Sequence, residues 1–271
     1  MPELPEVETT ARGIEPHLRD RRIARLVVHE HRLRWRVDPE LCRWNHGQQV
    51  TGVRRRAKYI LIEVTHGWLL LHLGMSGSLR ILPDSTALEP HDHFDLELDS
   101  RWTLRFNDPR RFGSLHHGVG DPLEHPLLAD LAPEPLDPEF DAAYLFRVTR
   151  KRRVAIKLAI MNSKLVVGVG NIYASEALFR AGIRPGRAAH TLTREECAAL
   201  VKSIKAVLKM AIEHGGTTLR DYVGAEGKPG YFKQKLFVYE RAGEPCRRCK
   251  EPIRHRNQGQ RSTYFCARCQ R

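Results

Sequence analysis

Two residues at the start of the sequence, Pro2 and Glu3, have the types that nucleophilic and acid catalysis require. A small residue after the start Met normally allows that Met to be removed, which leaves proline with a free secondary amine. An α-amino group has a pKa of about 7.7, against about 10.4 for lysine, so far more of it is neutral at pH 7. A neutral amine can attack an electrophilic carbon. Glu3 can donate a proton to a leaving or ring oxygen, and Glu6, one turn along, can position or polarise the pair.

The same stretch also fits the beginning of a helix. Pro5 and Glu6 suit a first helical turn, where proline is tolerated and acidic side chains favour the helix dipole. Apolar residues at helical spacing predict a helix from about Pro5 to Arg19. A helix start does not explain the dipeptide Pro2-Glu3. The residues alone therefore leave both a catalytic and a purely structural interpretation open.

Four cysteines near the end of the sequence have the spacing of a metal site. They form a C-x2-C pair, a spacer of 16 residues and a second C-x2-C pair: Cys246, Cys249, Cys266 and Cys269. This pattern is typical of a structural zinc ion held by four thiolates, and a cytosolic chain keeps its thiols reduced. We expect one structural Zn²⁺ there. Cys42 and Cys197 are isolated and are expected to be ordinary partly buried thiols.

The charge of the chain favours a polyanionic partner. The 45 Lys and Arg residues outnumber the 32 Asp and Glu residues, which gives a formal net charge of +13. Such a field most often serves nucleic acid, although a merely solvated basic surface is the alternative. No apolar run is long enough to span a membrane, and the acidic start lacks a signal-peptide core. We expect a cytoplasmic location.

Basic residues gather in four short stretches. Three of them suit phosphate contacts: "VRRRAKY" with Lys58, "TRKRRVAIK" with Arg152, and "GQRSTYF" with Arg261. The fourth, "NDPRRFG", places Arg110 beside Phe112 and could offer a base-edge donor and an insertable wedge. The structural alternatives are solvated faces for the first three stretches and a β-turn with a core Phe for the fourth.

Hydrophobic patterning divides the chain into a β-rich first half and a helical second half. Short, partly alternating runs predict strands at 58–64, 68–73, 77–82, 93–99 and 101–106. Three prolines in 130–140 indicate a linker or domain edge. Beyond it we expect helices near 141–149, 153–162, 171–181 and 193–214, with Asn171 as a helix cap and a Thr cap in "TLTREE". From Tyr231 to Glu240 the pattern predicts a return to β-structure.

Seven motifs, in this order and at these spacings, resemble the formamidopyrimidine-DNA glycosylases of bacteria, which act on 8-oxoguanine. They are "PELPEVET", "RRAKY" at 55–59, "HLGMSGSLR" at 72–80, "DPRRFG" at 108–113, "VVGVGNIYASEALF" at 166–179, "GGTTLRDYVGAEGKPGYF" at 215–232 and the four-cysteine finger with "QRSTYFC".

The resemblance implies an α+β fold with two domains. An N-terminal β-sandwich with flanking helices would occupy 1–130 and carry catalysis, followed by a Pro-rich linker at 131–140. A helix-two-turn-helix DNA-binding domain at 141–230 and a zinc finger at 231–271 would form the C-terminal domain. The partner would be double-stranded DNA with an oxidised purine, bound by a monomer, with the enzyme associated with the nucleoid.

The resemblance also implies roles for individual residues. Pro2 would attack C1′ of the damaged nucleotide, Glu3 would act as general acid with support from Glu6, and Lys58 and Arg261 would serve β- and δ-elimination. The positions implied to hold DNA are His91, Arg110, Arg152 and Asn171. The trio implied to fill the gap left by the flipped base is Met75, Arg110 and Phe112.

The sequence also allows three alternative interpretations. A zinc-dependent DNA-binding protein without catalysis would share the charge, the helices and the finger. An RNA-binding translation factor would suit the charge but leaves "DPRRF" and Glu3 without a role. The related endonuclease VIII type prefers oxidised pyrimidines, but "PELPE" and the stretch 220–231, which resembles a lid over purines, favour the purine enzyme.

Overall fold

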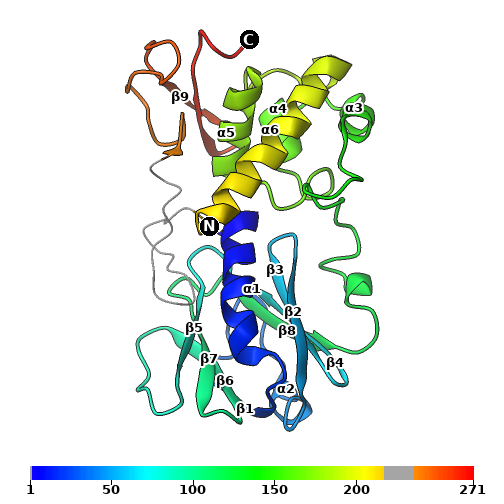
Figure 1. Ribbon diagram of the computed structural model, residues 1–271, viewed down its shortest axis with the longest axis vertical. Helices are drawn as coiled ribbons and strands as arrows, with labels where there is room; N and C mark the ends of the chain where they lie inside the picture. Colours follow the sequence, from blue (N-terminus) through cyan, green and yellow to red (C-terminus); the bar gives the residue numbers. More distant parts are fainter. Residues whose placement is uncertain (1, 217–234) are drawn as a thin grey trace. The chain divides into compact units, whose positions relative to one another are not determined.

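A computed structural model describes residues 2–216 and 235–271 of the 271-residue chain (Figure 1). The chain divides into two compact units. The first comprises residues 1–129 with 214–231, and the second comprises residues 130–213 with 232–271. Each is described by itself below.

The first unit contains two antiparallel four-stranded sheets. One has the order β1-β6-β7-β5 and the other the order β2-β3-β4-β8. Their strands are β1 (Ile23–Val28), β2 (Val50–Arg56), β3 (Tyr59–Val64), β4 (Gly67–His72), β5 (Ser78–Pro83), β6 (Asp92–Leu98), β7 (Trp102–Asn107) and β8 (Ser114–Gly118). The described residues of this unit also form α1 (Leu4–Leu18), the short helix α2 (Leu41–Trp44) and the 3₁₀ turn η1 (Pro122–Glu124).

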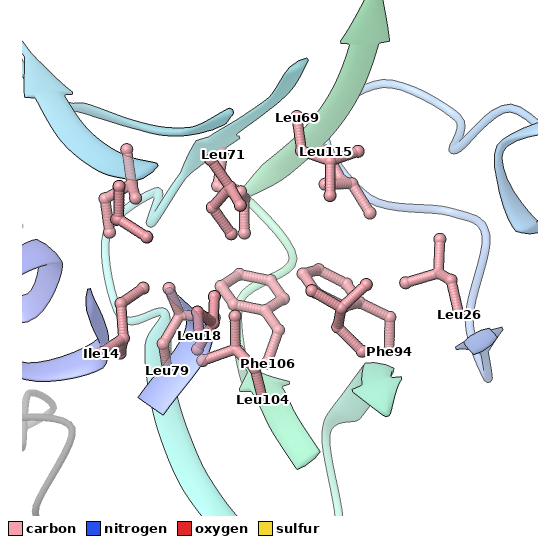
Figure 2. Packing of buried hydrophobic residues seen from close by; sticks show 14 of the residues in the cluster. Ile14, Leu18, Leu26, Leu69, Leu71, Leu79, Phe94, Leu104, Phe106 and Leu115 are labelled. Carbon is pink, nitrogen blue, oxygen red and sulfur yellow. The ribbon is translucent and has the colours of Figure 1, made fainter. Parts of the chain in front are cut away.

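The core of this unit lies between the two sheets and α1 (Figure 2). Phe94 of β6 and Phe106 of β7 stack with their ring centroids 5.0 Å apart. They face Leu69, Leu71 and Leu115 from the other sheet, and α1 adds the buried Ile14 and Leu18. Each fully buried side chain of this kind contributes about 1.5–3 kcal/mol. The expected sandwich with a flanking helix is confirmed.

The five predicted strands are observed close to their predicted bounds, but three further strands were missed. β2 contains Arg54, Arg55 and Arg56, and β8 contains His116 and His117, so polar residues hide the alternation. β1 is buried at only two of its six positions. These strands are fixed by register with their neighbours rather than by their own composition.

Imidazole and indole rings gather along β8, at the edge of its sheet. The ring of His116 lies 5.4 Å from that of Trp35 and 5.4 Å from that of His125. Burial lowers the pKa of His116 to about 4, and repulsion from His125 and His117 acts in the same direction. His116 is therefore neutral in the folded protein at pH 7.

The unfolding midpoint in urea is expected to fall as the pH is lowered from 7 towards 4. An unfolded histidine has a pKa of about 6.5. Between pH 6.5 and about pH 4, the unfolded chain therefore binds a proton at His116 that the folded protein does not bind. The stabilisation is present above pH 6.5 and is lost on acidification. Urea titrations at several pH values should show a flatter dependence for His116→Gln. Equal slopes for His116→Gln and wild type would contradict the prediction.

The second unit is mainly helical. Its helices are α3 (Ala142–Thr149), α4 (Ile156–Ile160), α5 (Asn171–Ala181) and α6 (Arg194–Glu213), with a 3₁₀ turn η2 (Ala189–Thr191). Thr193 caps α6 as predicted, because its hydroxyl accepts the N–H of Glu196 at 3.2 Å. Gly182 ends α5 in the left-handed conformation that a helix C-terminus favours. The α+β class is confirmed.

The predicted strand at 231–240 is wrong in its described part. Residues 235–240 form turns, and the backbone N–H groups of Phe237, Val238 and Tyr239 all donate to the Glu176 carboxylate at 2.9 Å. These amides are therefore not available to a sheet. The only strands of this unit among the described residues are β9 (Arg254–Gln258) and β10 (Arg261–Phe265), which pair as a hairpin.

Candidate active site

The first turn of α1 brings Pro2, Glu3 and Glu6 together in the interior. Pro2 is buried, Glu3 is 3 % exposed and Glu6 is fully buried. Glu3 caps the helix in a reciprocal box: its N–H donates to Glu6 Oε2 at 2.9 Å, and its side chain accepts the N–H of Glu6. The two interpretations of this stretch are thus compatible. The capping box fixes the carboxyl group of the residue that follows Pro2.

Gly216 lies against this pair. Its φ is +79°, and a Cβ there would stand 3.0 Å from Glu6 Oε1. Only glycine adopts this conformation without strain and also leaves Glu6 in place. The "GGTTL" motif therefore contributes a backbone contact behind the capping box.

For the base excision that the resemblance implies, Gly216→Ala is expected to lower the rate more than it lowers the stability of the protein. The left-handed conformation costs an alanine about 1–2 kcal/mol, and the new methyl group must displace the Glu6 carboxylate. Rates of lesion excision, compared with urea unfolding midpoints, check this. Gly215→Ala is a matched control, because its φ is +71° but no atom lies within 4 Å of its added Cβ. Equal losses of excision in the two variants would contradict a role for the Glu6 contact.

Lys58 occupies the tight turn between β2 and β3. Ala57 takes a positive φ of 54° there, and Lys58 is half-buried. Its neighbour is His72, at the end of β4, whose ring lies 4.8 Å from that of Tyr59. Burial, with the nearby charges of Lys58 and Arg34 acting in the same direction, lowers the pKa of His72 to about 4. Sequence reasoning missed His72, although it opens the quoted motif "HLGMSGSLR".

The turn after β7 and the turn after β4 lie side by side. A Cβ on Gly74 would stand 2.5 Å from the backbone of Phe112 and Gly113, so only glycine allows this approach. Met75, half-buried, thus lies next to the Arg110–Phe112 stretch. Arg110 is exposed and packs 5.2 Å from the Phe112 ring, which is itself 42 % exposed. Phe112 is not a core residue, which excludes the structural alternative for this turn.

The second unit carries the other residues singled out from the sequence. Arg152 is exposed, and its carbonyl accepts the N–H of His190 at 3.0 Å. Asn171 is the first residue of α5 rather than its cap, which is Gly170, so that expectation was wrong. The reason is that the extended conformation falls on Gly170. The Asn171 side-chain oxygen is buried without a hydrogen-bond partner.

Arg261 opens β10 and is exposed at the tip of the hairpin. The residues after it are anchored to α4. The fully buried Lys157 donates to Ser262 O at 2.8 Å and to Thr263 Oγ1 at 2.9 Å. The position of Arg261 relative to α4 is therefore fixed from inside the unit.

The four cysteine sulfurs converge as a tetrahedral metal site requires. All lie within 4.8 Å of one another, with Cys246 Sγ 3.9 Å from Cys269 Sγ and Cys249 Sγ 3.4 Å from Cys266 Sγ. A tetrahedron of thiolates about 2.3 Å from zinc has edges of about 3.8 Å. Burial opposes ionisation of Cys246, but N–H groups of Cys249 and Arg248 outweigh it and lower its pKa to about 7. The cluster fits a structural metal ion.

Comparison with known proteins identifies the family. Family models match the formamidopyrimidine-DNA glycosylase N-terminal domain over residues 1–115, its H2TH domain over 131–223, and the zinc finger found in FPG and IleRS over 243–271. The formamidopyrimidine-DNA glycosylase of Thioalkalivibrio sulfidiphilus is 60 % identical over the whole of both chains. The chain belongs to the formamidopyrimidine-DNA glycosylase family. The suspected resemblance is confirmed.

Solved structures of the family agree with this fold. The MutM (Fpg) protein of Thermus thermophilus is 38 % identical, has a TM-score of 0.89, and is matched over 99 % of this chain and 98 % of that one. A variant of Fpg from Lactococcus lactis, solved with Fapy-dG-containing DNA, is 32 % identical with a TM-score of 0.94 over all of both chains.

Members of the formamidopyrimidine-DNA glycosylase family are DNA glycosylases with abasic-site lyase activity, and this chain is an enzyme of that class, as expected. The match to the H2TH model also confirms the helix-two-turn-helix domain. The stretch 220–231, expected to cover a purine, lies outside the described residues. Across 2–216 and 235–271, no helix has the length and apolar character needed to cross a bilayer.

Proposed function

We propose that this enzyme removes oxidised purines, such as 8-oxoguanine and formamidopyrimidines, from double-stranded DNA and then nicks the abasic strand. It does so as a monomer, in the cytoplasm, with one structural Zn²⁺ held by its four clustered cysteines. The division of the chain into 1–130, 131–140, 141–230 and 231–271 is part of this proposal. The observation that carries it is the buried start of α1, where Glu3 is fixed beside Pro2 by the capping box with Glu6.

In the first step, the free nitrogen of Pro2 forms a bond to C1′ of the damaged nucleotide. The bond from C1′ to the base breaks, and the base leaves with a proton. Glu3 donates its proton to the ring oxygen, the sugar opens, and an iminium joins protein and DNA. Glu6 holds Glu3 in position. The base must leave the stack before C1′ can be reached.

In the second step, the iminium makes the C2′ protons acidic. Lys58, in our assignment, removes one C2′ proton, and the 3′ phosphate is expelled. A second elimination, which we assign to Arg261, expels the 5′ phosphate. Water then releases Pro2. Lys58 is held in its tight turn and Arg261 by the anchored hairpin, so each can also contact a phosphate.

The remaining residues bind the duplex. We assign His91, Arg110, Arg152 and Asn171 to DNA contacts. Asn171 begins α5, so its side chain lies at a helix N-terminus, where anions are favoured, and its buried side-chain oxygen has no hydrogen-bond partner. Met75, Arg110 and Phe112 fill the vacated stack, which their adjacent turns support.

Borohydride trapping tests the proposal directly. The protein is mixed with a duplex carrying 8-oxoguanine opposite cytosine, and borohydride then reduces the iminium to a stable amine. A covalent adduct is expected with the lesion duplex and none with undamaged duplex. A duplex with an oxidised pyrimidine, trapped in parallel, measures the preference for purines. Binding without an adduct would instead indicate a DNA-binding protein without catalysis.

A further inference from the structure

Asp108, directly after β7, is fully buried, and its carboxylate joins two turns. Its Oδ1 accepts the hydroxyl of Ser76 at 2.7 Å and the N–H of Arg110 at 3.2 Å, and its Oδ2 accepts the N–H of Gly113 at 2.8 Å. One carboxylate therefore closes the 108–113 turn at both ends. The same group ties that turn to Ser76, the residue after Met75.

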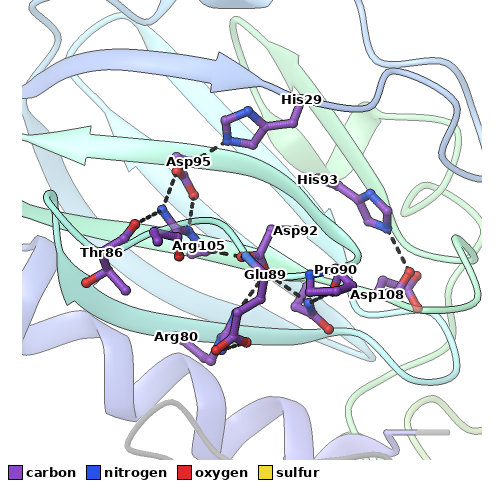
Figure 3. A network of polar contacts seen from close by, with 12 residues as sticks. His29, Arg80, Thr86, Glu89, Pro90, Asp92, His93, Asp95, Arg105 and Asp108 are labelled. Atoms are coloured by element: carbon purple, nitrogen blue, oxygen red, sulfur yellow. Dashed lines mark hydrogen bonds and ion pairs between the residues drawn. The ribbon is translucent and has the colours of Figure 1, made fainter.

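The backbone of Asp108 holds a third segment. The N–H of Asp108 donates to the carbonyl of His91 at 3.0 Å. The carbonyl oxygen of Asp108 lies 2.7 Å from His93 Nε2 (Figure 3). His91 has a φ of +74°, a conformation that a non-glycine residue keeps only where its surroundings fix it. The hydrogen bond from Asp108 is one of the contacts that fix it.

The outer residues of these three segments are the ones assigned to DNA. Arg110 and His91 are exposed and Phe112 is 42 % exposed, while the group that anchors their backbones is inaccessible to water. The hydrogen bonds from Ser76, Arg110 and Gly113 all end on a carboxylate that is fully buried. Water cannot replace such a bond when the acceptor is buried.

We propose that Asp108 is a positioning residue for insertion of side chains into the duplex. It holds the backbones that carry Met75, Arg110, Phe112 and His91 as one rigid unit, so that the four side chains contact the DNA together. The inference rests on the proposed function. Its physical reason is that four side chains on three separate turns would each lose conformational freedom on binding unless their backbones were already fixed.

Asp108→Asn tests the inference with little change in volume. One acceptor oxygen becomes an NH₂ donor, so the N–H of either Gly113 or Arg110 loses its acceptor, and the bond to the Ser76 hydroxyl must reverse if the second oxygen is the one replaced. The probe is a duplex with a stable abasic analogue and 2-aminopurine in the neighbouring base pair. The fluorescence of 2-aminopurine rises when a wedge unstacks it.

Asp95→Asn is the matched control. Asp95 is 5 % exposed, lies in β6 of the same sheet, and accepts two hydrogen bonds from Arg105 at 2.8 Å. Its replacement perturbs a buried carboxylate of the same sheet whose partners Arg105 and His29 lie outside the three segments (Figure 3). Ser76→Ala, which cuts only the tether to the Met75 turn, serves if Asp108→Asn does not fold.

At saturating protein, Asp108→Asn is expected to lose most of the fluorescence rise and to excise 8-oxoguanine about 10–100-fold more slowly in single turnover, the scale of a 1 Å misplacement. Ser76→Ala should lose part of the rise, and Asp95→Asn should keep it even where its melting temperature falls equally. A full fluorescence rise in Asp108→Asn would overturn the inference, and so would an equal loss of the rise in Asp95→Asn. If Asp108→Asn does not fold, a full rise in Ser76→Ala would overturn it. If wild type forms no borohydride adduct, the proposed function fails instead.

Discussion

Protein that keeps any residue in front of Pro2 is expected to form no borohydride adduct with lesion-containing DNA. An acylated proline nitrogen has no free electron pair with which to attack C1′, whereas a free α-amino group with a pKa of about 7.7 is partly neutral at pH 7. We expect adduct and base excision to disappear together, a loss of at least about a thousandfold in rate. Gel separation of the trapped species and intact mass of the protein measure both.

The control for this experiment is the same protein with a cleavable leader. Removing the leader so that Pro2 again comes first should restore the adduct to the wild-type yield. Unfolding midpoints before and after cleavage separate blocked chemistry from lost structure. Wild-type yield of adduct from protein whose mass still includes Met1 would place the nucleophile on another residue.

Replacing Cys249 with Ser is expected to unfold the finger and weaken DNA binding at least about tenfold, equivalent to about 1.4 kcal/mol. Structural zinc contributes about 10–16 kcal/mol to folding of such segments, and a hydroxyl is a poor substitute for a thiolate. The hairpin that carries Arg261 loses its support, because Cys266 directly follows β10. Zinc content by mass spectrometry and affinity for a duplex with an abasic analogue measure the effect.

Cys42→Ser is the matched control for the finger. Cys42 is partly buried in α2, outside the cluster, so this variant should keep one zinc ion and wild-type affinity. The sheets of the first unit should melt normally in both variants. Full zinc occupancy in Cys249→Ser would contradict four-thiolate ligation, and melting of the first unit with the finger would contradict independent units.

Local pattern was sufficient for the elements whose residues carry their own signal. Helices α1, α5 and α6 combine an apolar face with cap residues, and strands β3 to β7 keep enough alternation to be found. Strand β9, "RHRNQ", has no buried residue and exists only because β10 and the cysteine turns hold it in register. No local rule predicts such a strand.

The candidate site divides in the same way. Pro2, Glu3 and the four cysteines are recognisable from type and spacing, because each set is closely spaced in sequence or repeats a known ligand pattern. Asp108 is not recognisable, because its partners Ser76 and His91 lie 32 and 17 positions away and only the packed sandwich brings them to it. Long-range partners of this kind need the structure.

The hydrogen bonds between Glu176 and the N–H groups of residues 237–239 have a consequence for protein engineering. Glu176 in α5 is 3 % exposed, and its carboxylate accepts the N–H groups of three consecutive residues just ahead of the cysteine segment. A finger transplanted with residues 237–239 onto another scaffold would leave their three N–H groups without an acceptor. A foreign finger grafted here would leave the buried Glu176 carboxylate without hydrogen-bond donors. Chimaeric proteins should therefore exchange α5 and the finger together, with the junction placed before Asn171.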